Sequence, residues 1–182
     1  PDRFGPRSFR IGQQLPAEHR GDWLNFIIDR NLIQGDWGNY IQAPVLHLQD
    51  SIGDRSLKGM DLAVAGDVPI AAGLSSSSSI VVSALEASLA FNNIQIPTDE
   101  KAEFCGRAEW LVGTRGGSGD HAAMLHAKKQ GLVSLQFFPL RTQSVPFDDD
   151  YRVVACNSFV EHSSTGVFNE RIATYEIGLL LI

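Results

Sequence analysis

The sequence predicts an α+β fold, because segments with helical and with strand-like apolar patterns intermix without the regular rhythm of a βαβ sheet. Helical spacing or helix-forming composition marks residues 36–50 and 80–91. Short apolar runs that are typical of strands occupy residues 57–65, 132–138 and 151–156. With 182 residues, 43% of them apolar, the chain is long enough to bury one sizeable core.

The first third of the chain is predicted to contain one helix and one strand. Residues 1–22 are polar and rich in Arg, Pro and Gly, which indicates a loop or a short edge strand. Over residues 36–50 the apolar positions recur at steps of three and four, and Pro44 inside this helical pattern predicts a kink or a break. Residues 57–65 are predicted to enter a turn at Gly66 as a strand.

The middle of the chain is predicted to be helical. Residues 80–91 are good helix formers with small residues on one face. Thr98 is a suitable N-cap for a second helix, which we expect to run to about Leu111. A glycine-rich loop then leads into a short helix over residues 120–125.

The apolar period changes in the last third of the chain. Strands are predicted over residues 132–138 and 151–156, with a turn between them at residues 148–150. A final helix is expected to begin around Val167.

Composition and charge exclude several classes of protein. The net charge of -6 argues against nucleic acid as the main partner, because such proteins usually present a basic face. No apolar run approaches the roughly 18 residues of a membrane span, and the first residues show no signal peptide pattern. We therefore expect a cytoplasmic protein with neither a membrane nor a nucleic acid partner.

The cysteines and the two ends of the chain lead to two further expectations. Cys105 and Cys156 lie in apolar stretches and are expected to be buried free thiols in a reducing compartment. The chain begins at Pro1 and ends in the apolar run 176–182, so we expect it to be a piece of a longer protein.

Residues 69–79 form a glycine–serine stretch that joins a predicted strand to a predicted helix. A flexible linker is one interpretation, but a linker is normally polar on both sides, and this one has apolar flanks. The alternative is a phosphate-binding loop, since Gly73 lets the backbone approach a ligand and the serines expose N–H groups at a helix N-terminus. Serine hydroxyls can also bind Mg²⁺ beside phosphates. The common P-loop pattern is absent from the sequence.

A second glycine-rich stretch covers residues 112–121, with Asp120 at the start of the helix that follows. Asp120 is interpreted either as a simple helix cap or as a catalytic carboxylate, and the two roles are compatible.

Four stretches in the same order resemble the GHMP kinases, and among them the galactokinases most closely. Residues 69–79 match Pro-x-x-x-Gly-Leu-Ser-Ser-Ser-Ala-x, with Ser78 in place of Ala. Residues 112–121 match Val-Gly-x-x-x-Gly-x-Met-Asp-Gln, with Gly119 for Met and His121 for Gln. The other two matches are residues 37–41, similar to Trp-x-Asn-Tyr-Val, and residues 157–171, similar to Asn-x-x-Val-x-His-Ser followed by Tyr-x-x-Arg.

The resemblance implies a fold and a domain division. It implies the GHMP kinase N-terminal domain, which resembles the second domain of ribosomal protein S5 and contains a left-handed βαβ crossover. Residues 1–160 would form this domain, incomplete at its N-terminus. Residues 161–182 would begin a truncated C-terminal domain.

The resemblance also implies an enzyme that moves the γ-phosphoryl group of ATP to a sugar hydroxyl, with the anomeric position as the expected acceptor. Asp120 would face that hydroxyl as general base or electrostatic anchor, and Trp37 would line the adenine pocket. Mg²⁺ would be bound by Ser77 and by Glu109, for which a solvated helix face is the plainer interpretation. The implied phosphate-binding residues are Gly73, Leu74, Ser75, Ser76, Ser77 and Ser78. The implied substrate contacts are Gly117, Asp120, His121 and Phe168, although His121 is also compatible with a helix position of no role.

Departures from the galactokinase pattern leave other functions open. The N-terminal sugar-binding signature and the C-terminal glycine-rich loop of the family are missing. Phe168 stands where galactokinases have a tyrosine that contacts the sugar, so another sugar, or a uronic acid reached by Arg115, is a possible substrate. Two alternative functions are a nucleotide- and sugar-binding sensor without turnover and a kinase from another GHMP branch, acting on a mevalonate-like or amino-acid alcohol.

Overall fold

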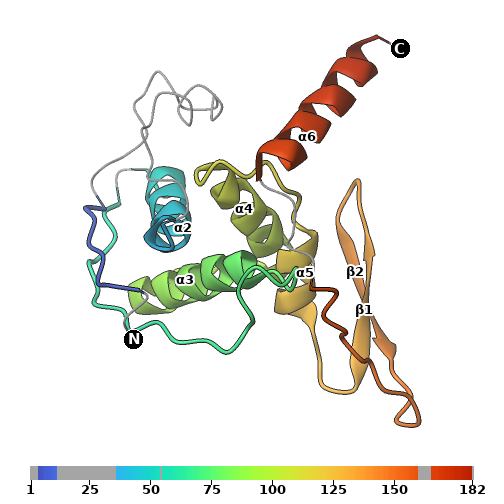
Figure 1. Cartoon of the computed structure of the whole chain (residues 1–182). Helices are drawn as coiled ribbons and strands as arrows, with labels where there is room; N and C mark the ends of the chain where they lie inside the picture. The colour runs from blue at the N-terminus through green and yellow to red at the C-terminus, as the bar shows by residue number, and fades with distance from the viewer. Residues whose placement is uncertain (1–3, 12–35, 54, 160–164, 182) are drawn as a thin grey trace.

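Helices and a small antiparallel sheet make up the computed structural model, which describes residues 4–11, 36–53, 55–159 and 165–181 (Figure 1). The helices are α2 (Gly38–Ser51), α3 (Ser76–Asn92), α4 (Thr98–Trp110), α5 (Gly119–His126) and α6 (Thr165–Leu180). The sheet consists of β1 (Gly131–Gln136) and β2 (Arg141–Pro146). The predicted α+β class is confirmed.

The hydrophobic core lies between α2, α3 and α4, which pack against one another at the left and centre of Figure 1. Its buried members come from all three helices and from the segment after α2: Val45, Leu48, Leu57, Val81, Leu85, Leu89, Cys105 and Ala108. Each buried Val or Leu side chain stabilises the fold by about 1.5–3 kcal/mol relative to exposure. This packed body supports the loops that carry the polar site.

Helix α2 shows how local chemistry starts a helix and how packing extends it. Asp36 accepts a hydrogen bond of 2.9 Å from the backbone N–H of Gly38 and forms an ion pair of 2.7 Å with Arg7. These two contacts hold the pKa of the Asp36 carboxyl below its usual value. The helix continues through Pro44, so the expected break is wrong, while the alternative, a kink, stays a prediction. Pro44 is fully buried, and core packing offsets the backbone hydrogen bond that proline cannot donate.

His47 on α2 is a half-buried base. Its ring stacks on Phe104 of α4, with ring centroids 4.1 Å apart. Burial, assisted by the positive charge of Arg107, lowers the pKa of His47 to about 4.

Helices α3 and α4 begin differently from the sequence-based expectation. Helix α3 starts at Ser76 rather than at residue 80, because its serines satisfy local backbone carbonyls, as in the bond of 2.7 Å from Ser79 Oγ to Ser76 O. Thr98 is not the cap of α4 as predicted but its first helical residue, and Pro97 occupies the cap position. Proline already has the fixed φ that suits a helix entry, and acidic residues in the first turn favour the positive end of the helix dipole.

Two of the three predicted strands are wrong. The sheet pairs β1 with β2, in a register from Gly131 opposite Pro146 to Gln136 opposite Arg141. Residues 57–65 and 151–156 are not strands, because neither segment has a ladder partner among the described residues. Cys156 in the second segment is a free thiol, but it is exposed rather than buried as expected. Cys105 is free and buried, in agreement with the expectation.

Helix α6 begins at Thr165, close to the predicted start, and projects away from the helical body (Figure 1). The left-handed crossover implied by the family resemblance requires parallel strands, and the described residues contain only the antiparallel pair, so it stays a prediction. Within the described part of the chain, none of the helices is both long and apolar enough to cross a membrane.

Candidate functional site

The two glycine-rich stretches meet through one short hydrogen bond. Ser75 immediately precedes α3, and Asp120 lies in the first turn of α5. The hydroxyl of Ser75 donates to Oδ2 of Asp120 at 2.5 Å, across 45 positions of sequence. The tertiary structure therefore places the expected phosphate-binding loop beside the expected catalytic carboxylate.

The loop before α3 has the backbone geometry of an anion-binding turn. Gly73 and Ser75 have positive φ angles of 72° and 56°. A Cβ atom at Gly73 would meet no atom within 4 Å, so the space beside the loop is open. The first helical hydrogen bond runs from Ser79 N to Ser75 O, and the preceding N–H groups of the turn have no helical acceptor. Such groups, with the helix dipole, suit the oxygens of a phosphate.

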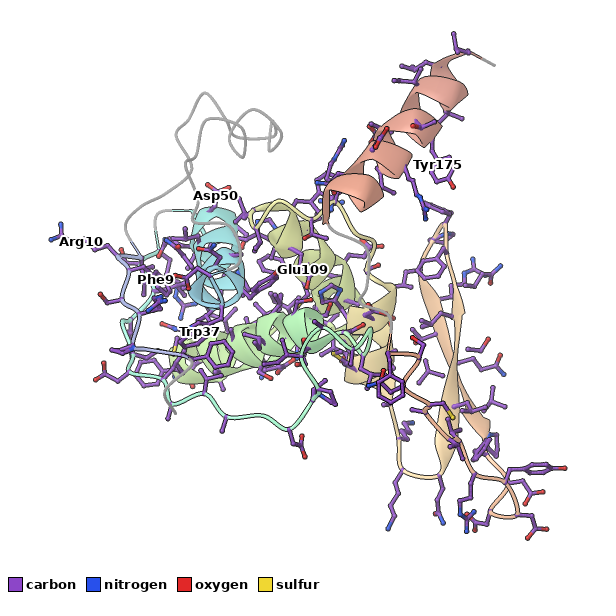
Figure 2. The ribbon with its side chains drawn as sticks, in the orientation of Figure 1. Phe9, Arg10, Trp37, Asp50, Glu109 and Tyr175 are labelled. Carbon is purple, nitrogen blue, oxygen red and sulfur yellow. The ribbon has the colours of Figure 1, made fainter. Side chains whose placement is uncertain are left out.

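A buried polar cluster lies behind this surface, where α3, α4 and α5 meet (Figure 2). Glu109 of α4 accepts a hydrogen bond of 3.0 Å from the hydroxyl of Ser78. Nε2 of His121 lies 3.5 Å from the same oxygen, Oε1. Only 6% of Glu109 and 1% of His121 is exposed. A buried carboxylate is costly unless it is paired, so this cluster is a built feature and not the solvated helix face considered above.

The charge of Glu109 influences its neighbours. Burial raises the pKa of the Cys105 thiol to about 12, and Glu109 adds to this effect. Burial and then Glu109 also raise the pKa of Tyr40. Both ring nitrogens of His121 have no hydrogen-bond partner within the described ranges, so the site contains a buried donor or acceptor that is still unsatisfied.

The second glycine-rich loop is fastened from two sides. On one side, Nε1 of Trp110 donates to Gly116 O at 3.0 Å, and the guanidinium of Arg115 lies 5.2 Å from the centre of the same indole ring. On the other side, Asn169 bonds to the backbone of the loop, and Arg115 forms an ion pair of 3.0 Å with Glu176. The guanidinium that we considered for a uronic acid is thus already paired with a carboxylate.

The remaining predicted site residues are Trp37, Gly117 and Phe168. Trp37 packs edge-on against Phe4, with centroids 6.3 Å apart, and lies to the left of Glu109 in Figure 2. Its buried Nε1 has no hydrogen-bond partner among residues that the structure describes. Gly117 is exposed near Asp120, whereas the Phe168 side chain lies outside the described residues. The adenine and sugar roles of these residues stay predictions.

The oxygen ligands that this site offers suit a hard cation that also binds phosphate oxygens. In the described part of the chain, no group of three or more His, Cys, Asp and Glu residues could hold a metal by itself. Mg²⁺ commonly needs only one or two protein carboxylates, completed by substrate phosphates and water. Glu109 with the hydroxyls of the first turn of α3 matches that pattern. Ser78 bonds to Glu109, whereas Ser77, half-buried one position earlier, makes no side-chain hydrogen bond to any described residue.

Several contacts that shape this site were not predicted from the sequence. Ser78 and His121, which were expected to bind phosphate and substrate, both contact Glu109. Trp110 is half-buried and supports the loop through its hydrogen bond to Gly116 O. Asn169 received no role, although its place next to Phe168 in the fourth resembling stretch was a usable signal.

Comparison with known proteins matches part of the chain to one protein family. Residues 39–128 match the family model for the GHMP kinases N-terminal domain. The galactokinase of Pyrococcus furiosus is 30% identical over 172 residues, which cover 92% of this chain and 48% of that protein. The galactokinases of Glaesserella parasuis and a Roseiflexus species are 30% and 28% identical, and the matches cover 80% and 91% of this chain.

The matched region includes the main features of the site. The match to the family model contains both glycine-rich loops and the Glu109 cluster. The chain spans less than half the length of each of these relatives, at 48%, 39% and 42%. Residues 39–128 therefore match the N-terminal domain of the GHMP kinases, and the sequence of the chain is galactokinase-like.

Proposed function

We propose that the protein is an ATP-dependent kinase that transfers the γ-phosphoryl group of Mg-ATP to a hydroxyl of a sugar, with the anomeric hydroxyl as the expected acceptor. The observation that carries this proposal is the hydrogen bond of 2.5 Å between Ser75 and Asp120. It brings an anion-binding turn and an exposed carboxylate into contact. Phosphoryl transfer needs these two elements side by side, since positioning and charge stabilisation supply most of its catalysis.

On the donor side, the backbone N–H groups at the start of α3 would bind the phosphate oxygens of ATP, and Gly73 leaves room for them. The residues proposed for this contact are Gly73, Leu74, Ser75, Ser76, Ser77 and Ser78. Glu109, with Ser77 or Ser78, would hold Mg²⁺, which neutralises phosphate charge when it is bound.

On the acceptor side, the Asp120 carboxylate would orient the sugar hydroxyl and take up its proton as the oxygen attacks the γ-phosphorus. The bond from that phosphorus to the β–γ bridging oxygen breaks in the same step, and ADP leaves. Ser75 would hold Asp120 near the phosphate until the sugar arrives. Trp37 is proposed for the adenine, and Gly117, His121 and Phe168 for the sugar.

Release of ADP by the full-length protein tests the proposal. Mg-ATP would be supplied with neutral sugars, uronic acids, mevalonate-like alcohols and amino-acid alcohols in separate reactions, and binding of Mg-ATP would be measured in parallel. ADP that appears only with a sugar or a uronic acid would support the proposal and identify the substrate. ADP with another alcohol would indicate a different GHMP branch, and intact binding without ADP would favour a sensor.

The location and domain division are also proposals. We place the protein in the cytoplasm, and we assign residues 1–160 to the N-terminal domain and 161–182 to the start of the next one. Limited proteolysis of the full-length protein tests the division, since a domain boundary would give cleavage near residue 160.

A further inference from the structure

We infer that α6 positions the glycine-rich loop that leads to Asp120, and that Asn169 is the positioning residue. This inference rests on the proposed function, because it concerns the alignment of the proposed catalytic carboxylate. It is carried by contacts between α6 and residues 113–116, which were not expected from the sequence.

The side-chain amide of Asn169 bonds to the loop backbone at two points. Its Nδ2 donates to Gly113 O at 2.6 Å, and its Oδ1 accepts from the backbone N–H of Arg115 at 3.0 Å. One half-buried side chain therefore satisfies a carbonyl and an N–H group two residues apart, as a neighbouring strand would. Gly113 has a positive φ of 95°, so the loop depends on a conformation that other residues rarely adopt.

A second contact lies on the same face of α6. Glu176 is seven residues after Asn169, which is close to two helical turns. Its carboxylate accepts from Nη2 and Nη1 of Arg115 at 3.0 and 3.2 Å. The exposed fraction of the Glu176 side chain is 54%, so solvent weakens this ion pair. The Asn169 contact is therefore expected to contribute more than the ion pair.

The face of α6 that carries Asn169 and Glu176 is the one that joins the helix to the rest of the described structure. Tyr175 points away from the body in Figure 2 and is 71% exposed. In the described part of the chain, the side-chain hydrogen bonds that join α6 to another segment are those of Asn169 and Glu176.

The loop is held between two helices, and this explains how α6 would act on Asp120. Trp110 of α4 also bonds to Gly116, and only residues 117–119 separate Gly116 from Asp120. Misplacement of a catalytic group by about 1 Å can cost on the order of 100-fold in rate. Asn169 does not contact Asp120, so its effect would pass through the loop backbone.

The test combines hydrogen exchange with kinetics in the full-length protein. In Asn169→Ala, the amides of residues 113–116 should exchange about tenfold faster, because two hydrogen bonds are lost. For the same reason, kcat with the sugar that the ADP assay identifies should fall about tenfold. The KM for ATP should stay within about twofold, because the loop before α3 is a separate segment. Alanine is the best helix former, so α6 should remain folded.

Matched variants show which contact of α6 causes the effect. Glu176→Gln should give a smaller change of the same kind, about two- to threefold, since its ion pair is exposed. Glu170→Gln makes the same chemical change on the same helix, at an exposed side chain that makes no hydrogen bond or ion pair with a described residue, and it should behave like the wild type. Asn169→Asp keeps the acceptor for Arg115 N–H but loses the donor to Gly113 O, so exchange should rise less than in the alanine variant.

The outcomes separate this inference from the proposed function. Unchanged exchange in Asn169→Ala would show that Asn169 does not hold the loop backbone, whatever the activity. Faster exchange with unchanged kcat in an active enzyme would overturn the positioning role. If the wild type releases no ADP with any acceptor, the proposed function fails. The contact is then still judged by exchange alone, with faster exchange in Asn169→Ala supporting it.

Discussion

The two glycine-rich loops differ in how they are held. The loop before α3, residues 69–75, is exposed over most of its length, and among described residues its side-chain tie to another element is the Ser75–Asp120 bond. The loop before α5, residues 113–118, is bonded by Trp110 from α4 and by Asn169 from α6.

This difference matches the two tasks that a kinase divides between its loops. An open turn with exposed N–H groups can bind phosphates, and the entropy cost of ordering the turn arises when the ligand binds. A fastened loop holds a reacting group in place before the ligand arrives, so that cost has already been met in folding. We therefore interpret the first loop as a binding loop and the second as a positioning loop, and the following variants test that contrast.

The largest effect is expected for Asp120→Asn. The amide keeps the shape and can still accept from Ser75, but it cannot take up a proton, so kcat should fall by about 100- to 10,000-fold. Mg-ATP affinity, measured by calorimetry, should stay within a few-fold. Asp61→Asn, at an exposed position, is the control and should be neutral. A large loss of ATP affinity would contradict the assignment of Asp120 to the acceptor side.

Glu109→Gln should raise the Mg²⁺ concentration needed for half-maximal activity, on the order of 10- to 100-fold, because the carboxylate is lost while Ser78 can still donate. The pKa of Tyr40, followed by ultraviolet titration, should move down toward its usual value. Glu103→Gln, exposed on the same helix, is the matched control. An unchanged Mg²⁺ requirement together with a lowered Tyr40 pKa would mean that Glu109 is buried for structure alone.

The packed helices α2, α3 and α4, which support the positioning loop, should become less stable in acid because of His47. Its pKa of about 4 in the fold lies below the usual 6.5, so between these values the unfolded chain binds the proton and the folded chain does not. Stability is therefore complete above pH 6.5 and falls as the pH drops toward 4, by up to about 3 kcal/mol. Denaturant unfolding of His47→Phe, which keeps the stacking on Phe104, should show a smaller loss. An equal loss in both proteins would exclude His47 as the cause.

The smallest effect is expected for Gly73→Ala in the binding loop. The added Cβ meets no atom within 4 Å, so the cost is that of the positive φ alone, about 1 kcal/mol. ATP affinity should fall about fivefold, while kcat at saturating ATP should hardly change. Gly59→Ala also meets no atom and has no positive φ, so it is the matched control. A large fall in kcat would show that both loops position reacting groups.

Local patterns determined much of the fold. Helical spacing predicted α2, a short apolar run predicted β1, and a short helix was expected after the second glycine-rich loop, where α5 lies, because each signal depends on residues within a few positions. The glycine–serine and glycine-rich loops were also recognised in the sequence, as was Asp120 at the start of a helix. In these cases the chemistry lies in adjacent residues, so one stretch of sequence contains the whole signal.

Only the tertiary structure decided which of these parts touch. Strand identity failed for residues 57–65 and 151–156 because a strand requires a distant partner, and the exposure of Cys156 follows from that failure. The Ser78–Glu109 bond spans 31 positions and the Asn169 contacts span more than 50. Packing of α3, α4 and α5 places Glu109 in a buried centre, and residue spacing along one chain carries no such information.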